Sequence, residues 1–418
     1  MNKRIIAGIL SFALTLSTGV SLSGCGTSAS AADLMAGVKA RAVSTSVDLN
    51  GGAAGAVAGF AVRLLQNSAA AGKNTLISPF SVLCALAMTA NGARGETLAQ
   101  MEDVFGLSIP ELNACLHGCL AKLSTGDNDQ VSAADSIWFK DDAGLTVEAD
   151  FLQTNADYYG ASVYKAAFDD ATLKAINAWV RDNTDGMIES ILDRIPDEAV
   201  MYLINALAFD AEWEDIYRED QVRDGAFTTA SGATRNAALM YHTEGRYLDD
   251  GRATGFLKYY AGQKYAFAAL LPNAGVSVAD YIASLTGEEL VRTLDSAREA
   301  AVETAIPKFE SAYSVEMRGI LQSMGMTDAF DGDRADFTGL GRSEAGNIFI
   351  SRVIHKTEIA VDARGTKAGA AAAVVVEASA MPPDDIKTVF LDRPFVYLLL
   401  DCETGLPLFI GTVTDTGR

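Results

Sequence analysis

Residues 363–383 read ARGTKAGAAAAVVVEASAMPP, and this run of small side chains indicates more about the fold than any other stretch. At a period of two, one face of the run carries the side chains of Thr366, Ala368, Ala370, Ala372 and Val374. Lys367, the only charge in residues 365–376, falls on the other face, and no proline interrupts residues 365–381. The segment can therefore become a buried strand without burying an ion.

The rest of the chain predicts one large domain. Its 418 residues are 49% hydrophobic and 8% aromatic, which suffices for a packed core, and they show no internal repeat. Apolar spacing predicts helices over residues 53–66, from Pro79 towards Gly92, from Gly95 onward, over 173–182 and over 315–324. Strand patterns cover residues 131–139, 199–209, 239–271 with breaks at Gly245, Gly251 and Gly262, and 390–412 around a turn at 403–405. Because helices and strands mix without regular βαβ units, we expect the α+β class.

The N-terminus has the layout of a secretory signal. Lys3 and Arg4 precede an apolar run over residues 5–16, and small residues follow. Residues 22–25, Leu-Ser-Gly-Cys, resemble the lipobox of bacterial lipoproteins, which implies a lipid on Cys25; an unmodified signal cleaved nearby is the alternative. We expect residues 1–24 to be the signal, 25–52 a flexible tether, and 53–418 the domain, held outside the cell on a bacterial surface.

Charge argues against two kinds of partner. The formal net charge is −21, so neither nucleic acid nor an anionic lipid surface attracts the domain, and membrane contact is expected only through the lipid anchor. Three acidic pairs could be mistaken for catalytic carboxylates, but each lies in a turn-like stretch and is interpreted as solvated surface: Asp169-Asp170, Asp249-Asp250 and Asp384-Asp385.

The cysteines and histidines give no sign of a catalytic or metal site. Cys115 and Cys119 are four residues apart on a predicted helix, without the second cluster that a zinc site needs. Together with Cys84 and Cys402 they are expected to be buried free thiols. The chain has three histidines and no G-x-S-x-G elbow, so we expect neither an enzyme nor a bound metal or cofactor.

Several motifs resemble those of the serpin family and follow the family's order over residues 53–418. They are residues 74–81 (NTLISPFS), 92–97 (GARGET), 205–213, 307–309, 321–330, 336–340, 354–362 and 393–397. The resemblance implies a serpin fold, with a large central mixed β-sheet, further sheets, about eight or nine helices and an exposed reactive-centre loop. With the lipobox, the chain resembles a bacterial lipoprotein member of this family.

The resemblance also implies roles for individual residues. Four polar residues would meet beneath the central sheet as a gating cluster that opens when a strand enters: Ser78, Ser81, Asn205 and His355. Trp213 and Lys308 would mark the insertion point. The hinge of the loop would comprise Gly365, Thr366, Ala368, Gly369, Ala370, Ala371 and Ala372. Without the resemblance, the four polar residues could equally be unrelated and satisfied locally.

The function implied is inhibition of serine endopeptidases by a suicide-substrate mechanism. The target protease would cut the loop, form an acyl-enzyme and stay covalently attached while the cut loop enters the sheet. The family's loop length, counted from Ala363, places the cut between Ser379 and Ala380, with Glu377, Ala378 and Met381 as alternative bait residues. Small residues there suit elastase-like or subtilisin-like proteases.

A non-inhibitory serpin that acts as a binding or carrier protein is the alternative function, and the small inward face of the hinge favours inhibition. We expect a monomer, with loop-sheet polymers as a hypothesis because residues 374–376 are three valines. Two positions depart from the family pattern. Ala363 stands where Glu is usual, so Lys308 and Arg364 need other partners or the closed sheet opens more easily, and Ala372 replaces the usual Thr.

Overall fold

The structure is a computed structural model that describes residues 31–43, 52–70, 72–123, 131–142, 144–366 and 386–417, without the side chains of residues 133 and 134. In these ranges the helices are α1 (Gly52–Ser68), α2 (Pro79–Ala90), α3 (Gly95–Phe105), α4 (Ile109–Leu123), α5 (Ala149–Tyr159), α6 (Asp170–Asn183), α7 (Val278–Ser284), α8 (Gly287–Asp295) and α9 (Arg318–Ser323). Short 3₁₀ turns lie at Glu219–Gln221 and Asp328–Phe330.

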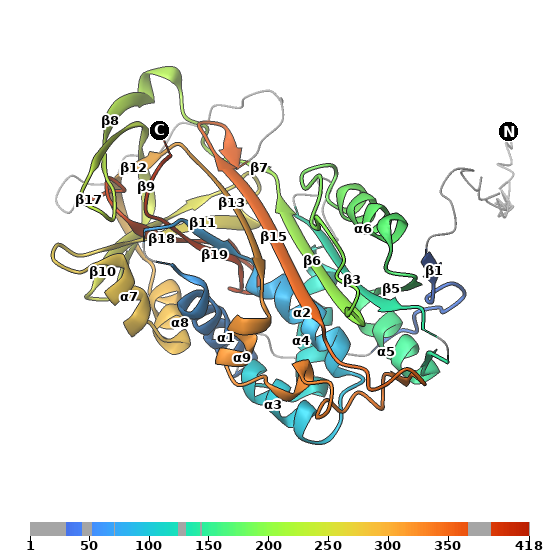
Figure 1. The fold of residues 1–418 in the computed structure, drawn as a ribbon. Coiled ribbons are helices and arrows are strands. Elements are labelled where there is room, and N and C mark those ends of the chain that lie inside the picture. The colour runs from blue at the N-terminus through green and yellow to red at the C-terminus, as the bar shows by residue number, and fades with distance from the viewer. Residues whose placement is uncertain are drawn as a thin grey trace, which may run out of the picture.

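Two large β-sheets form most of the fold (Figure 1). The central sheet has the order β1 (Ala31–Asp33), β5 (Ser162–Ala166), β3 (Val131–Lys140), β6 (Met201–Phe209) and β15 (Arg352–Val361), followed by β13 (Phe309–Glu316) along most of β15 and by β16 (Gly365–Thr366) and β7 (Ala211–Glu212) at its end. The second sheet runs β17 (Lys387–Phe390), β12 (Arg298–Pro307), β9 (Thr234–Asp249), β10 (Ala253–Tyr259), β11 (Tyr265–Pro272), β18 (Phe395–Asp401), β19 (Pro407–Val413) and β2 (Thr75–Ile77), with β8 (Val222–Thr228) also on β9. β4 (Thr146–Val147) and β14 (Gly341–Arg342) form a small third sheet.

The central sheet is mixed, because β6 pairs with β15 and β3 with β5 in parallel whereas β3 and β6 are antiparallel. The expected α+β architecture, with a large mixed sheet, further sheets and about nine helices, is therefore confirmed within the described residues. Among these residues, no single helix is long and apolar enough to cross a membrane. Only α3 and α4 taken together reach such a length and composition, and they are bent by 48° where they meet.

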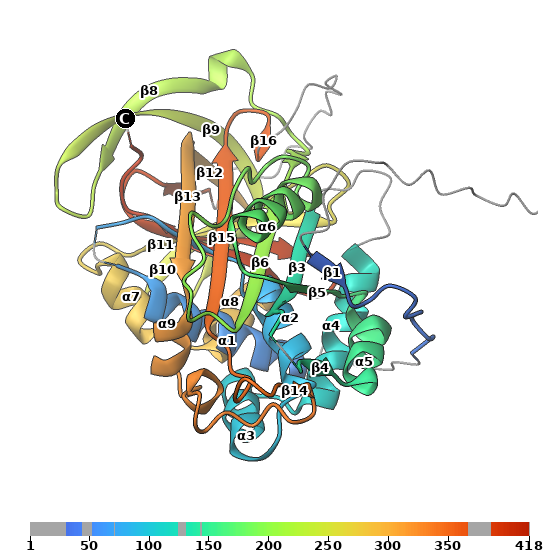
Figure 2. The ribbon, with the colours of Figure 1, turned by 45° about the vertical axis from the view of Figure 1, so that its right-hand side comes forward.

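Hydrophobic cores cover both faces of the central sheet. One face packs on α2 and the second sheet through residues such as Leu203 and Leu207, and the other packs on α6 through Tyr202 and Ile204. All nine residues of β6 are buried, which agrees with its apolar sequence, interrupted only by Asn205. Figure 2 shows α6 in front of the long strands and α2 behind them.

Helix α2 begins where the sequence predicts. The Ser78 hydroxyl accepts a hydrogen bond from the Ser81 N–H, and Pro79 occupies the first helical position, where no N–H is needed. Every residue of α2 is buried, so this capped start holds Ser78 and Ser81 firmly against the central sheet.

Two predicted elements differ in their bounds. The helix predicted over residues 315–324 begins only at Arg318, because Val315 and Glu316 pair with His355 and Ile354 as the end of β13. The break predicted at Gly245 is wrong, since β9 runs through it from Thr234 to Asp249. A register shift in the neighbouring strand β12, between Glu299 and Val302, accommodates this position.

The N-terminal segment is a further correction. Residues 31–43 are not part of a tether, because β1 pairs with β5 at the edge of the central sheet. Arg41 Nε and Nη2 both donate to Asp157 Oδ2, at 3.0 and 2.8 Å, and the Arg41 N–H donates to Asp157 Oδ1 at 2.7 Å. The backbone and the charge pair together fix this segment. Residues 25–30, 44–51 and the predicted signal 1–24 lie outside the described residues.

The four cysteines in the described part of the chain are free thiols. Cys84, Cys115 and Cys119 are buried, as predicted. Cys402 is exposed, contrary to the prediction, because it lies in the turn after β18.

Candidate functional site

The hinge begins as a short strand already seated in the central sheet. Thr366 of β16 pairs with Val361 of β15 on one side and with Ala211 of β7 on the other. The Thr366 side chain is fully buried, and its hydroxyl lies 2.6 Å from the Tyr260 hydroxyl. Gly365 is required here, since a Cβ atom at this position would lie 2.1 Å from the Ala211 carbonyl oxygen. Gly365 and Thr366 are thus held in the central sheet by pairing with β15 and β7.

Trp213 holds the turn that leads into the hinge. Its indole N–H donates to the Asp362 carbonyl at 2.9 Å, and its backbone N–H donates to the Arg364 carbonyl at 2.8 Å. The ring stacks on Tyr260 with 4.4 Å between centroids. The structure therefore places Trp213 directly against residues 362–364, at the predicted insertion point.

Lys308, the other predicted insertion residue, lies next to the same turn and has no charge partner among the described residues. It directly precedes Phe309, which pairs with Val361. None of the described carboxylates forms an ion pair with Lys308, whereas Arg364 Nη2 lies 3.6 Å from Glu212 Oε1. Arg364 thus pairs with another residue, Glu212. Within the described part of the chain, no other carboxylate pairs with Lys308 in place of the Glu that is usual at position 363.

The four predicted gating residues meet beneath the central sheet. The Ser78 N–H donates to His355 Nε2 at 3.1 Å, and His355 Nδ1 lies 2.5 Å from Asn205 Oδ1. The Asn205 amide nitrogen in turn donates to Ser81 Oγ. All four residues are fully buried. The contacts show a connected cluster, and its gating role stays a prediction.

The hydrogen bonds of this cluster define its proton positions. Because Nε2 of His355 accepts the Ser78 N–H, the ring proton sits on Nδ1 and is donated to Asn205. Burial lowers the pKa of His355 to about 3, so the ring is neutral at physiological pH. The bond from His355 to Asn205 joins β15 to β6, the two parallel strands that a new strand would have to separate.

Asp135 is a fifth member that the sequence analysis missed. Its Oδ1 atom accepts from Asn205 Nδ2 at 2.5 Å and from Ser81 Oγ at 3.2 Å. Burial raises the pKa of Asp135 to about 7, although these two bonds oppose the rise. The signal in the sequence was a single acid inside the otherwise uncharged strand pattern of residues 131–139.

A buried charged group under the insertion point was also missed. Lys258 is 1% exposed, and its Nζ lies 2.9 Å from Glu244 Oε1 and 4.5 Å from the centroid of the Tyr217 ring. His242 Nδ1 lies 3.1 Å from the same carboxylate oxygen. Burial raises the pKa of Glu244, but Lys258 and His242 together outweigh it and leave the pKa lowered. Lys258 Nζ also lies 5.4 Å from the centroid of the Trp213 ring, so this charged cluster packs against the residue that holds the turn before the hinge.

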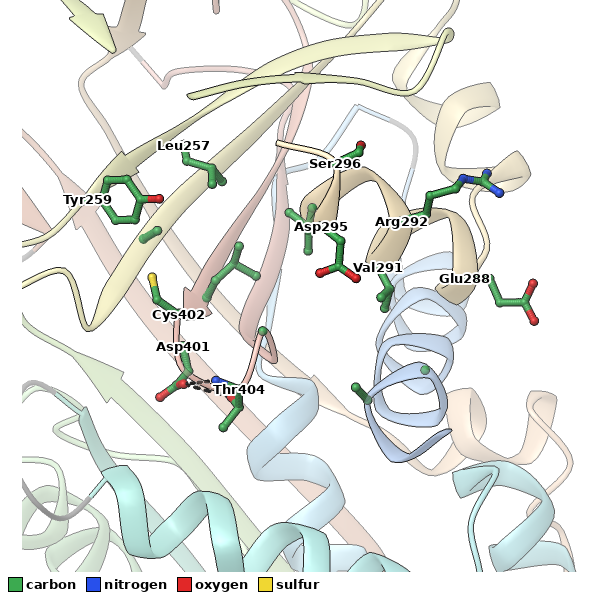
Figure 3. Close-up of a pocket in the computed structure, with 16 residues that line it drawn as sticks. Leu257, Tyr259, Glu288, Val291, Arg292, Asp295, Ser296, Asp401, Cys402 and Thr404 are labelled. Carbon is green, nitrogen blue, oxygen red and sulfur yellow. Dashed lines mark hydrogen bonds between the residues drawn. The ribbon is translucent and has the colours of Figure 1, made fainter. Parts of the chain in front are cut away.

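A pocket of about 740 Å³ lies apart from the hinge, between α1, α8 and the strands β10, β11 and β18 (Figure 3). Its charged lining is mostly acidic, with Glu288, Asp295 and Asp401 against Arg292, and Cys402 also lines it. The Asp401 carboxylate accepts the N–H groups of residues 403 and 404 and so shapes the turn at one edge. Among the described residues, no group of His, Cys, Asp and Glu is arranged to hold a metal ion.

The remaining predicted site residues lie outside the described part of the chain. They are the lipidation residue Cys25, the hinge residues Ala368, Gly369, Ala370, Ala371 and Ala372, and the reactive bond between Ser379 and Ala380.

Comparison with known proteins identifies the class of this fold and site. A family model described as "Serpin (serine protease inhibitor)" matches residues 55–416. The chain therefore belongs to the serpin family, whose members are mostly protease inhibitors and not enzymes.

Individual relatives agree with this assignment. The chain is 45% identical to the thermophilic serpin tengpin in its native state, with a TM-score of 0.86 over 92% of this chain and 99% of that one. A serpin in a loop C-sheet polymer is 42% identical, with a TM-score of 0.77 over 91% of this chain and 99% of that one. The leukocyte elastase inhibitor of Sus scrofa is 29% identical over 84% of this chain and 96% of its own length.

Proposed function

We propose that this serpin inhibits serine endopeptidases as a suicide substrate, with the Ser379–Ala380 peptide bond as the bait. The protease serine Oγ would attack the Ser379 carbonyl carbon, the peptide bond would break, and the Ala380 amine would leave with a proton. The ester between protease and Ser379 would persist because the cut loop enters the central sheet before water can reach it.

The register of β16 carries this proposal. Thr366 lies between Val361 and Ala211, which are 150 residues apart in sequence. His355 and Asn205, which pair directly where β15 meets β6, are also 150 residues apart, so the two places share one register. A strand that continues antiparallel from Thr366 therefore needs no bulge to fit between β15 and β6. Six residues further on, Ala372 would lie between His355 and Asn205 and replace the bond that now joins them.

The side chains of the hinge suit this path. Thr366 faces the core, so Ala368, Ala370, Ala372 and Val374 would face it too, and none of these is large or charged. About a dozen new ladder hydrogen bonds at roughly 0.5–1.5 kcal/mol each would supply on the order of 10 kcal/mol for insertion. Small residues around the cut favour elastase-like or subtilisin-like proteases over trypsin-like ones.

The test is to mix the chain from Ala31 onward, which keeps β1, with elastase-like, subtilisin-like and trypsin-like proteases and to examine the products on a denaturing gel. We expect a covalent adduct with an elastase-like or subtilisin-like protease and a released peptide that begins at Ala380. A carrier or binding function is the alternative, and the acidic pocket beside α8 is where it would act. Cleavage with no adduct for any protease would favour that alternative.

We also propose that Cys25 carries a lipid that displays the domain on a bacterial cell surface. The signal layout of residues 1–24 and the lipobox-like residues 22–25 support this. The full chain expressed in a bacterium should enter the membrane fraction and take up an alkyne-labelled fatty acid. Cys25→Ser should lose the label and move to the soluble extracytoplasmic fraction; equal labelling of both chains would contradict the proposal.

Loop-sheet polymers are a proposal for heated or aged protein. The three valines at 374–376 give the loop strand propensity, and a neighbour's central sheet offers the same register that the chain's own loop would use. Size-exclusion chromatography after mild heating should show oligomers, and a chain that stays monomeric would count against the idea.

A further inference from the structure

A second pocket, of about 800 Å³, lies at the end of the central sheet where β6 and β15 begin. Four arginines line it: Arg194, Arg318, Arg334 and Arg352. Three acids also contribute, Glu198, Glu316 and Asp331. In a chain with 33 basic and 54 acidic side chains, this is a local excess of positive charge. We call it the arginine pocket.

Three of the four guanidinium groups have no ion pair with an acid in the ranges that the structure describes. Arg334 is paired with Asp328 at 3.0 Å and with Asp331 at 3.2 Å. For Arg194, Arg318 and Arg352, no ion pair with any described carboxylate is present. Three guanidinium groups of the arginine pocket thus form no contact ion pair within the described chain, although Glu198 and Glu316 also line the pocket.

The nearest acids are already engaged or lie in solvent. Glu316 Oε1 accepts the N–H of Arg318 at 3.0 Å and that of Val353 at 3.2 Å, so this oxygen serves the backbone. Glu198 is exposed. A bound anion would therefore not have to displace an existing ion pair from the three free arginines.

The free arginines are held near one another. Burial raises the pKa of Tyr202, Arg352 and Arg194 oppose that rise, and Glu198 adds to it, which places both cations and one carboxylate near this phenol. Arg318 Nη2 donates to the Phe330 carbonyl at 2.8 Å, which fixes its guanidinium while most of its five N–H groups stay available. Guanidinium groups bind phosphate through paired N–H donors.

We propose that the arginine pocket binds a small anion with at least two negative charges, of the phosphate class, through Arg194, Arg318 and Arg352. The binding itself follows from charge and geometry and does not require that the protein inhibits proteases.

The position of the pocket gives the anion a consequence, and this part rests on the proposed function. Arg194 precedes β6, whereas Arg352 begins β15, so the anion would bridge the two strands that loop insertion separates. Ser351 Oγ accepts the N–H groups of Val200 and Met201 at 2.8 and 3.3 Å. These bonds join the beginnings of β6 and β15, and we call the line along which the two strands pair the seam. An anion bound only by the closed form would hold the sheet shut.

Binding is tested by calorimetry on the chain from Ala31 onward, with inorganic phosphate and pyrophosphate at constant ionic strength set by chloride. We expect saturable binding of one anion with a Kd of about 1 mM or below. Arg194→Gln and Arg352→Gln should each weaken it about tenfold or more. The control is Arg235→Gln, whose guanidinium pairs with Asp415 elsewhere and which should bind as the wild type does. Absence of binding to the wild type, or equal binding by all variants, would overturn the proposal.

The consequence is tested by hydrogen exchange at the seam, where the Ser351 N–H donates to the Met201 carbonyl. At ten times the wild-type Kd, pyrophosphate should slow exchange of this amide about elevenfold in the wild type and about twofold or less in Arg352→Gln. If anion binds but exchange is unaffected, the site stands and its clamping role is refuted. Neither readout uses a protease, so a failure of the inhibitory function would be seen separately.

Discussion

Replacing Asp135 by Asn tests whether the gating cluster contains a neutral acid. Both hydrogen bonds that the carboxyl group accepts, from Ser81 Oγ and Asn205 Nδ2, go to the same oxygen, Oδ1. An amide offers that oxygen in the same place, so Asp135→Asn keeps both bonds and removes the ionisable proton. The titratable neighbours are His355, which is neutral, and Cys84, whose pKa burial raises further with help from Asp135. Among the described residues, no cation therefore compensates a negative charge at Asp135.

The magnitude follows from the pKa of Asp135, which is about 7 in the folded chain against an ordinary value of 3.8. Each pKa unit corresponds to about 1.4 kcal/mol, so ionisation costs the fold up to about 4 kcal/mol. The residue is half-buried, not sealed, and we therefore expect about 2–4 kcal/mol. Because the folded-state pKa is raised, this stability is complete below the ordinary pKa and is lost as the pH rises through about 7.

The assay is urea unfolding of wild type and Asp135→Asn between about pH 4 and about pH 8.5. We expect a small difference in the free energy of unfolding at about pH 4 and a variant that is about 2–4 kcal/mol more stable at about pH 8. Asp224→Asn, at an exposed carboxylate on β8, is the control and should show no such growth with pH. A difference between Asp135→Asn and wild type that stays constant across the range, or a variant less stable at about pH 8, would refute the reasoning.

Three further substitutions probe the insertion point and the hinge. Lys258→Met leaves the Glu244 carboxylate buried without its main partner and should cost about 3–5 kcal/mol in urea unfolding, most of it recovered when Glu244→Gln is added. Trp213→Phe loses the indole N–H bond to the turn before the hinge and part of the ring stacking, and should lower the free energy of unfolding by about 1–2 kcal/mol, measured in the same way. Ala372→Arg puts a charge on the inward face and should convert trapping into plain cleavage on a denaturing gel, whereas Ala373→Arg, on the outward face, should still form the adduct; equal behaviour of the two would contradict the register.

The local features of the fold could be predicted because each depends on neighbouring residues. The start of α2 follows from a serine cap and a proline at the next position. Strands β3 and β6 follow from their apolar patterns, and the structure gives them as Val131–Lys140 and Met201–Phe209. The meeting of Ser78, Asn205 and His355 was predicted only through the family resemblance, since nothing local brings residues so distant in sequence together.

The features that were missed depend on distant partners. Residues 31–33, Ala-Ala-Asp, have little strand propensity, and they form β1 because β5 offers a free edge and Asp157 binds Arg41, 116 residues away. Asp135 and Lys258 each look like a lone charge in a strand, and only the packing shows that Asn205 and Glu244 face them. Val315 and Glu316 were assigned to a helix by their spacing, but pairing with β15 overrides that preference.

Thermal unfolding before and after cleavage of the Ser379–Ala380 bond tests most directly whether the loop enters between β6 and β15. The measurement uses the chain from Ala31 onward, which keeps β1. The loop is cut at or beside the Ser379–Ala380 bond by a metalloprotease, which forms no acyl-enzyme and so cannot be trapped, and the protease is then removed. Insertion adds on the order of 10 kcal/mol of ladder hydrogen bonds, so the cut chain should unfold on the order of 10 °C or more above the intact chain. An unchanged or lower unfolding temperature after clean cleavage would contradict the account.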